Sequence, residues 1–196
     1  MRATGVRAKV ERAALVLFAA RGLDGVSVAE IAAAAGASQG ALYRHFASKD
    51  ELAWSLFSTA YRRTGAELDA IRQRERGFAA RIAAMVAHVC ALYDADPALF
   101  RFMLLSQHDL LPRVEAGWRT PVSAVEAAVA EAVAAGDLPP LDPAAGAAAI
   151  LGIVLQTAVF HLYGRLGGGL SERAGGLAQA ALGAARALAR SIASAA

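Results

Sequence analysis

Apolar residues recur at intervals of three and four along most of the chain, which is the spacing of one face of an α-helix. Between residues 26 and 49 the pattern comes in two short pieces. The first has Val28, Ile31, Ala32 and Ala35 on its apolar face. Ser27 stands three residues before Glu30, the spacing of a capping box, and Gly36 is the residue type that ends helices. These residues predict a short helix with a defined start and end.

A second short helix is expected directly after this glycine. Ser38 is an N-cap candidate, and Leu42 and Phe46 fall on one face of the helix that follows it. Gly40 and Arg44 fall on the opposite face. Two short helices joined by a tight glycine turn are typical of a helix-turn-helix, whose second helix fits the major groove of B-DNA.

The outer face of the second helix has side chains suited to DNA. Gln39 can pair with adenine and Arg44 with guanine, whereas the small residues Gly40 and Ala41 allow a close approach of the backbone. Contacts with phosphates, which set the register of the protein on DNA, are expected from Tyr43, His45 and Lys49. Spacing alone leaves an alternative open, because an ordinary α-hairpin in a helical protein has a similar pattern.

The literal residues favour DNA binding. The run Gly22 to Leu52 resembles the N-terminal domain of the TetR family of bacterial transcriptional regulators, most specifically in GALYRHFASKDEL. The resemblance implies DNA contacts from Ser27, Ser38, Gln39, Gly40, Ala41, Tyr43, His45 and Lys49. Two positions depart from the usual pattern, since many members carry Lys where this chain has Gln39 and Thr where it has Ala41. The two departures concern one phosphate contact expected of the family and the DNA sequence of the preferred operator.

The rest of the chain is also expected to be helical, which gives an all-α protein. A first helix is expected from about Val6 to Ala20, and Ser48 with Glu51 predicts the start of a fourth helix that runs to around Arg74. The charged segment 72–77 is the expected boundary region. We therefore expect a three-helix DNA-binding domain over residues 1–50 and a helical ligand-binding and dimerisation domain over 51–196.

The later helices have clear start signals. A helix is expected over Phe78 to Tyr93 from its apolar spacing. Three further starts carry an N-cap residue followed by proline, namely Asp96 and Pro97, Thr120 and Pro121, and Asp142 and Pro143. Ser171 is expected to cap a last helix that ends at about Ile192.

The stretch between Asp142 and Arg165 has no formal charge and is about long enough to span a bilayer. Its Gln156, its many alanines and the lack of a second such segment favour a buried helix instead. Small residues allow close helix approach here and in the last helix: Gly146, Ala149, Gly152, Ala180, Gly183 and Ala187. We interpret the pair as a homodimer interface, a four-helix bundle with two helices from each subunit. The family resemblance implies the same arrangement.

Candidate ligand-binding residues are scattered over the middle helices. They are aromatic, histidine or other polar residues that could line a cavity between helices: His88, Tyr93, Phe102, Met103, His108, Trp118, Gln156 and His161. The alternative is that they are ordinary core residues. No two histidines lie at helical metal-binding spacing, so neither a metal nor a cofactor is expected.

Enzyme chemistry finds little support in the sequence. The glycine-rich segment 164–171 follows a helix and lacks the Gly-Lys-Ser/Thr ending of a phosphate loop, and no catalytic triad can be proposed from spacing. A helical adaptor that binds only protein would leave Gln39, Tyr43 and Lys49 without a role. We expect a DNA-binding repressor, released from a palindromic operator by a small-molecule effector.

Composition agrees with a cytoplasmic globular protein. Hydrophobic residues make up 57% of the 196 residues and charged residues 19%, which excludes a disordered chain. The formal net charge of +3 resides in the first 50 residues, where a DNA-binding domain is expected. A single cysteine, Cys90, excludes an intramolecular disulfide, and the N-terminal residues lack the apolar core of a secretory signal.

Overall fold

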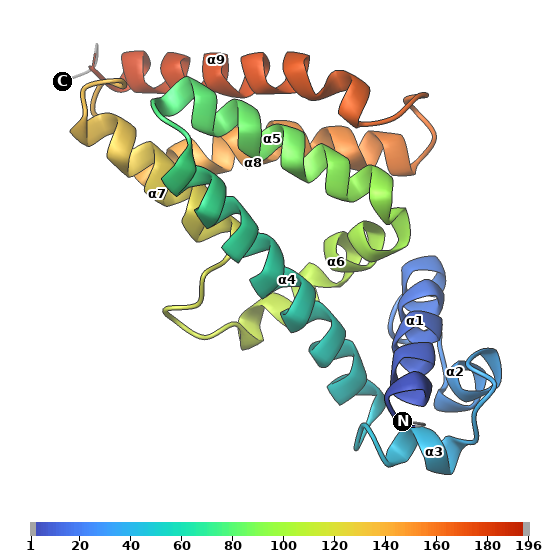
Figure 1. The fold of residues 1–196 in the computed structure, drawn as a ribbon. Coiled ribbons are helices and arrows are strands. Elements are labelled where there is room, and N and C mark those ends of the chain that lie inside the picture. The colour runs from blue at the N-terminus through green and yellow to red at the C-terminus, as the bar shows by residue number, and fades with distance from the viewer. Residues whose placement is uncertain (1–2, 194–196) are drawn as a thin grey trace. The chain divides into compact units, whose positions relative to one another are not determined.

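A computed structural model describes the chain from Ala3 to Ala193, with side chains from residue 5 to residue 191. Over these residues the regular structure is entirely helical, as the sequence predicts (Figure 1). The α-helices are α1 (Ala3–Arg21), α2 (Val28–Ala34), α3 (Gln39–Tyr43), α4 (Lys49–Arg74), α5 (Phe78–Ala95), α6 (Pro97–Leu110), α7 (Pro121–Ala134), α8 (Pro143–Leu162) and α9 (Ala174–Ala193). Two short 3₁₀ turns, Leu111–Arg113 and Ser171–Arg173, complete the list.

The helices group into two compact units that do not follow the order of the chain. The first unit holds the residues up to Tyr61 together with Asp96–Trp118. The second unit holds Arg62–Ala95 and the residues from Arg119 onward. Helix α4 is continuous and contributes its first half to the first unit and its second half to the second. The division at residue 50 stays a prediction, but α6 groups with the N-terminal helices.

The first unit has its own apolar core. Ile31, Leu42 and Phe46, from the stretch 26–49, are at most 2% exposed, as their spacing predicts. Helix α6 completes this core, because Phe102 is fully buried and its ring stacks on Phe18 of α1 at 5.9 Å between centroids. Burial of these large side chains stabilises the unit, at about 1.5–3 kcal/mol each.

An ion pair and an aromatic stack add to the contacts of the 96–118 segment with the rest of the first unit. Asp96 caps α6 by accepting from the Leu99 N–H, and its other oxygen accepts from Arg12 of α1 at 2.6 Å. At the other end of the segment, Trp118 stacks on Trp54 of α4 with centroids 5.7 Å apart. The segment is therefore anchored at both ends.

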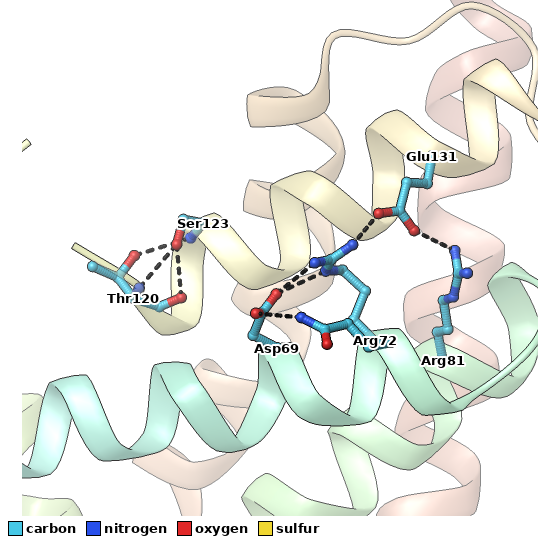
Figure 2. A network of polar contacts seen from close by, with 7 residues as sticks. Asp69, Arg72, Arg81, Thr120, Ser123 and Glu131 are labelled. Atoms are coloured by element: carbon cyan, nitrogen blue, oxygen red, sulfur yellow. Dashed lines mark hydrogen bonds and ion pairs between the residues drawn. The ribbon is translucent and has the colours of Figure 1, made fainter. Parts of the chain in front are cut away.

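In the second unit, α9 packs against α8 and α5, and α7 packs against α8 and α5. Helix α4 is joined to α7 by charged side chains (Figure 2). Glu131 of α7 accepts from Arg72 of α4 and, at 2.6 Å, from Arg81 of α5, whereas Asp69 accepts from both Nε and Nη2 of Arg72. The same view shows Thr120 and Ser123 closing a reciprocal cap at the start of α7.

The predicted helix starts at Ser48, Asp96, Thr120 and Asp142 are confirmed. Two expectations are wrong. Helix α3 ends at Tyr43 and not at Phe46, although turn hydrogen bonds from His45 and Phe46 to the Leu42 carbonyl continue its path. Ser171 does not cap the last helix with its side chain.

The start of the last helix is instead held by a residue far away in the sequence. The carboxylate of Asp94, at the end of α5, accepts hydrogen bonds from the N–H groups of Leu170 and Ser171, both at 2.8 Å. Partial burial works against the charge of Asp94, but these hydrogen bonds keep its pKa below the usual value. The segment between α8 and α9 is thus tied to α5.

Two helices, α5 and α8, are long and apolar enough to cross a membrane by length and composition alone, so the expectation that α8 is not accompanied by a second such segment is wrong. In the structure both pack against other helices of the second unit. For α8, however, only 28% of its most apolar window is buried inside the chain. The other residues of this window are half-buried or exposed in a single copy of the protein.

Candidate nucleic-acid interface

Helices α2 and α3 are fixed by their caps. The hydroxyl of Ser27 accepts from the Glu30 N–H, and the Glu30 carboxylate accepts from the Ser27 N–H at 2.8 Å, which is the predicted capping box. Ser38 caps α3 by accepting from the Ala41 N–H at 3.1 Å. Gly36 between the two helices has a φ of +62°, a conformation that favours glycine and makes the tight turn possible.

The carboxylate of Glu30 also joins this turn to α1. Arg21, the last residue of α1, donates to its second oxygen at 2.8 Å. Hydrogen bonds from the Ser27 backbone and then from Arg21 lower the pKa of Glu30 to about 2. Glu30 therefore stays charged at any physiological pH.

Helix α3 presents a polar face to solvent and an apolar face to the core. Leu42 is fully buried, whereas Tyr43 is 50% exposed. The other predicted contact residues of this region are exposed or half-buried: Ser38, Gln39, Gly40 and Arg44 are exposed, and Ala41 and His45 are half-buried. The structure thus brings these predicted DNA-contacting residues together on one surface, around a short helix with a rigid base.

Two of the predicted contact residues are engaged within the protein. The Ser27 hydroxyl donates to the Glu30 carboxylate at 2.7 Å, so a phosphate would have to replace that bond. The ammonium of Lys49 donates to the backbone carbonyls of Leu23 at 2.8 Å and Val26 at 3.0 Å. Because an ammonium has three hydrogens, one remains for a phosphate. Lys49 therefore also holds the connection between α1 and α2, a role that the sequence did not indicate.

The predicted ligand-binding residues do not form a single group. Phe102 lies in the core of the first unit and Met103 packs against it, Trp118 stacks on Trp54, and His108 is exposed. In the second unit, His88 bonds to Glu67 at 3.0 Å and Gln156 is exposed. The structure joins one predicted pair: the buried Tyr93 hydroxyl lies 2.7 Å from Nδ1 of His161.

The two hydrogen-bond partners of His161 determine which of its ring nitrogens carries the hydrogen in the neutral side chain. Its Nε2 lies 2.6 Å from the carbonyl oxygen of Gly168, which can only accept, so Nε2 carries the hydrogen. Nδ1 then accepts from the Tyr93 hydroxyl. Both polar groups are satisfied inside the protein, so this pair holds the 163–170 connector. Among the residues that the structure describes, there is no group of three or more His, Cys, Asp or Glu side chains that could hold a metal ion.

Residues 12–56, which include α2, α3 and the start of α4, match the family model described as bacterial regulatory proteins, tetR family. The chain belongs to the TetR family. A curated relative is MftR of Mycobacterium tuberculosis, which is named as a mycofactocin biosynthesis transcriptional regulator and has 44% identity with this chain over 61 residues. That alignment covers 31% of this chain and 31% of MftR, so the chain matches about a third of the relative's length.

Solved structures extend the likeness to the whole TetR-type fold. FadR from Bacillus subtilis, solved in complex with stearoyl-CoA, has a TM-score of 0.79 with 17% identity, covering 89% of this chain and 96% of FadR. A gamma-butyrolactone receptor, an ArpA-like protein, has a TM-score of 0.67 with 24% identity, covering 93% of this chain and 98% of that chain. At these identities the likeness shows the fold alone. The TetR family is one of regulatory proteins.

Proposed function

We propose that this protein is a DNA-binding transcriptional regulator that acts as a repressor. The observation that carries the proposal is the division of α3 into a buried side, with Leu42 at 0% exposure, and an outward side that holds Gln39, Tyr43 and Arg44. Gln39 and Arg44 have the hydrogen-bonding groups that read adenine and guanine in the major groove. Such a protein acts on DNA in the cytoplasm.

Gly40 adds an independent argument. Its φ is not positive, and a Cβ atom built on it would meet nothing closer than the Ser38 hydroxyl at 4.0 Å. Nothing inside the protein therefore requires glycine here, yet glycine in a helix costs about 0.5–1 kcal/mol relative to alanine. Close approach of a DNA backbone or base explains it. We expect Gly40→Ala to stabilise the protein slightly and to weaken DNA binding.

The test is fluorescence anisotropy of the purified protein with DNA from directly upstream of its own gene, against scrambled competitor at several salt concentrations. We expect tight binding that resists the competitor and weakens steeply with salt. Arg44→Ala should reduce the preference for the specific fragment. Arg76→Ala, at an exposed arginine between α4 and α5 in the second unit, is the matched control and should leave binding unchanged. Equal, weak binding to the two DNAs, and to fragments selected from the whole genome, would refute the proposal.

We infer that the protein is a homodimer formed through α8 and α9. Apart from Gln156, the exposed residues on α8 are small or apolar, among them Ala148, Gly152 and Phe160, and Phe160 is 50% exposed. A Cβ atom added to Gly152 or to Gly183 would have no described atom within 4 Å apart from its neighbours in the same helix. By contrast Gly146, also expected at the interface, packs inside the chain, since its Cβ would lie 2.8 Å from Val129. Close packing of a second copy accounts for the two outward glycines.

Size-exclusion chromatography with light scattering tests this interface. Gly183→Leu should produce a monomer and weaken binding to a two-half-site operator. Ala87→Leu, at an exposed small residue of α5, is the control and should remain dimeric. A wild-type monomer at micromolar concentration, or a Gly183→Leu dimer of unchanged stability, would show that the interface lies elsewhere.

A dimer with twofold symmetry is expected to bind a near-palindrome whose half-sites are about one helical turn apart. We infer that a small-molecule effector binds among the helices of the ligand-binding domain and favours a dimer whose recognition helices no longer match that spacing. The effector must then bind more tightly without operator than with it; a 100-fold difference is about 2.7 kcal/mol of coupling. Equal effector affinity in calorimetry with and without operator would rule out this mechanism.

A further inference from the structure

An arginine outside the helix-turn-helix lies against the end of the recognition helix. Arg7, in the second turn of α1, places its guanidinium carbon 5.1 Å from the ring centroid of Phe46. Phe46 is only 2% exposed, and it follows α3 by three residues. Figure 1 shows the N-terminal end of α1 beside α3, within the first unit. Arg7 therefore lies beside the residues that directly follow the recognition helix.

The guanidinium is held on two sides. Its Nε donates to Glu11, one turn further along α1, at 2.8 Å, and its face covers the Phe46 ring. The Arg7 side chain is nevertheless 48% exposed. An arginine has five N–H hydrogens, so the four on the two terminal nitrogens are not used by Glu11. These terminal nitrogens form the fork that binds phosphate with two parallel hydrogen bonds.

We propose that Arg7 binds a DNA phosphate next to the recognition helix, as a contact in addition to those of the helix-turn-helix itself. This inference rests on the proposed DNA-binding function. An aromatic ring under the guanidinium and a carboxylate at Nε fix the side chain before DNA arrives, which reduces the conformational entropy lost on binding. Phosphate contacts fix the position of a protein on the duplex without reading its sequence. Arg7 should therefore affect specific and non-specific DNA alike.

The chain offers a closely matched control. Arg63 on α4 donates from Nε to Glu67 four residues later, also at 2.8 Å, but it lies in the second unit. Arg7→Ala and Arg63→Ala each remove one positive charge and one helical ion pair. Only Arg7→Ala should lose a phosphate contact.

The experiment measures the affinity of the full-length protein for operator and scrambled DNA over a range of salt concentrations. Because the proposed dimer carries two copies of Arg7, Arg7→Ala should reduce the slope of log K against log salt by about 1.8, or about 0.9 for each copy, and weaken binding about five- to tenfold per contact near 0.1 M salt, for each DNA. Arg7→Lys keeps the charge but not the fork, so its slope should stay near that of the wild type while affinity falls two- to threefold. Arg63→Ala should match the wild type in slope and affinity.

Three outcomes would overturn or confine the inference. If Arg7→Ala has the slope of Arg63→Ala, Arg7 binds no phosphate, even if the melting temperature falls because Phe46 has lost its cover. Near-UV circular dichroism of Trp54 and Trp118, the two tryptophans of the chain, both in the first unit, verifies that this unit is folded. If Arg44→Ala changes binding and Arg7→Ala does not, only this inference fails. If the wild type binds no DNA, the proposed function fails with it.

Discussion

Replacement of Phe102 by alanine tests whether α6 is part of the core that supports the DNA-binding helices. Phe102 is fully buried and its ring stacks on Phe18 at 5.9 Å. Substitution of a buried phenylalanine by alanine costs about 3–5 kcal/mol, because it removes apolar burial and leaves a cavity. For a domain of 60–100 residues each kcal/mol shifts the melting temperature by about 4–8 °C. The first unit should therefore melt at least about 12 °C lower.

The two tryptophans make this measurement specific. Trp54 and Trp118 stack in the first unit, so the long-wavelength tryptophan band of near-UV circular dichroism follows that unit, whereas far-UV circular dichroism follows all helices. Phe102→Ala should lose the near-UV signal well before most of the helical signal. The control is Leu105→Ala on the same helix, whose side chain is 43% exposed and should cost at most about 0.5 kcal/mol. Melting of the two variants within about 2 °C of each other would refute the placement of α6 in this core.

Other predictions concern single side chains. Lys49→Ala should lower stability by about 1–3 kcal/mol in urea unfolding, because two backbone carbonyls lose a charged donor, and should weaken all DNA binding by a similar factor. Gln39→Ala should instead leave stability unchanged and relax the preference at one operator base pair by about 1–3 kcal/mol, measured with single-base operator variants. The pKa of Glu30 is lowered from 4.5 to about 2, so its contribution to stability is complete above about pH 4.5 and is lost as the pH falls toward 2; Glu30→Gln should make acid melting curves flatter over this interval. Burial, and secondarily Asp94, raise the pKa of the Cys90 thiol to about 11, so a thiol reagent at pH 8 should react with Cys90 only on the time scale of unfolding.

The sequence predicts local structure well where neighbouring residues determine it. Ser27 with Glu30 and Thr120 with Pro121 contain the information for a helix start within four residues, and both caps are present. Burial of Leu42 and Phe46 follows from helical spacing in the same way. The exposed DNA-binding face was therefore predictable, since it is the remainder of the same helix surface.

Contacts between distant residues were not predictable from spacing. Phe102 packs on Phe18, and Asp94 holds the start of the last helix, although Ser171 looked like a sufficient cap. The sequence indicated only a phosphate contact for Lys49. The backbone carbonyls of Leu23 and Val26, which accept hydrogen bonds from Lys49, cannot be recognised in a sequence pattern. The choice of ligand-binding residues stays a prediction for a similar reason, because aromatic residues at helical spacing serve cores and pockets equally well.

The two compact units are connected by more than one segment of the chain. Because the first unit includes Asp96–Trp118, the chain passes between the units at three places: inside α4, before Asp96, and after Trp118. Asp96, which directly follows α5 in the chain, is ion-paired with Arg12 of α1. The coupling needed for a 100-fold change in operator affinity is about 2.7 kcal/mol, which is less than the 3–5 kcal/mol expected from loss of Phe102 alone. In the proposed mechanism, an effector of that strength therefore need not disrupt the apolar core of the first unit.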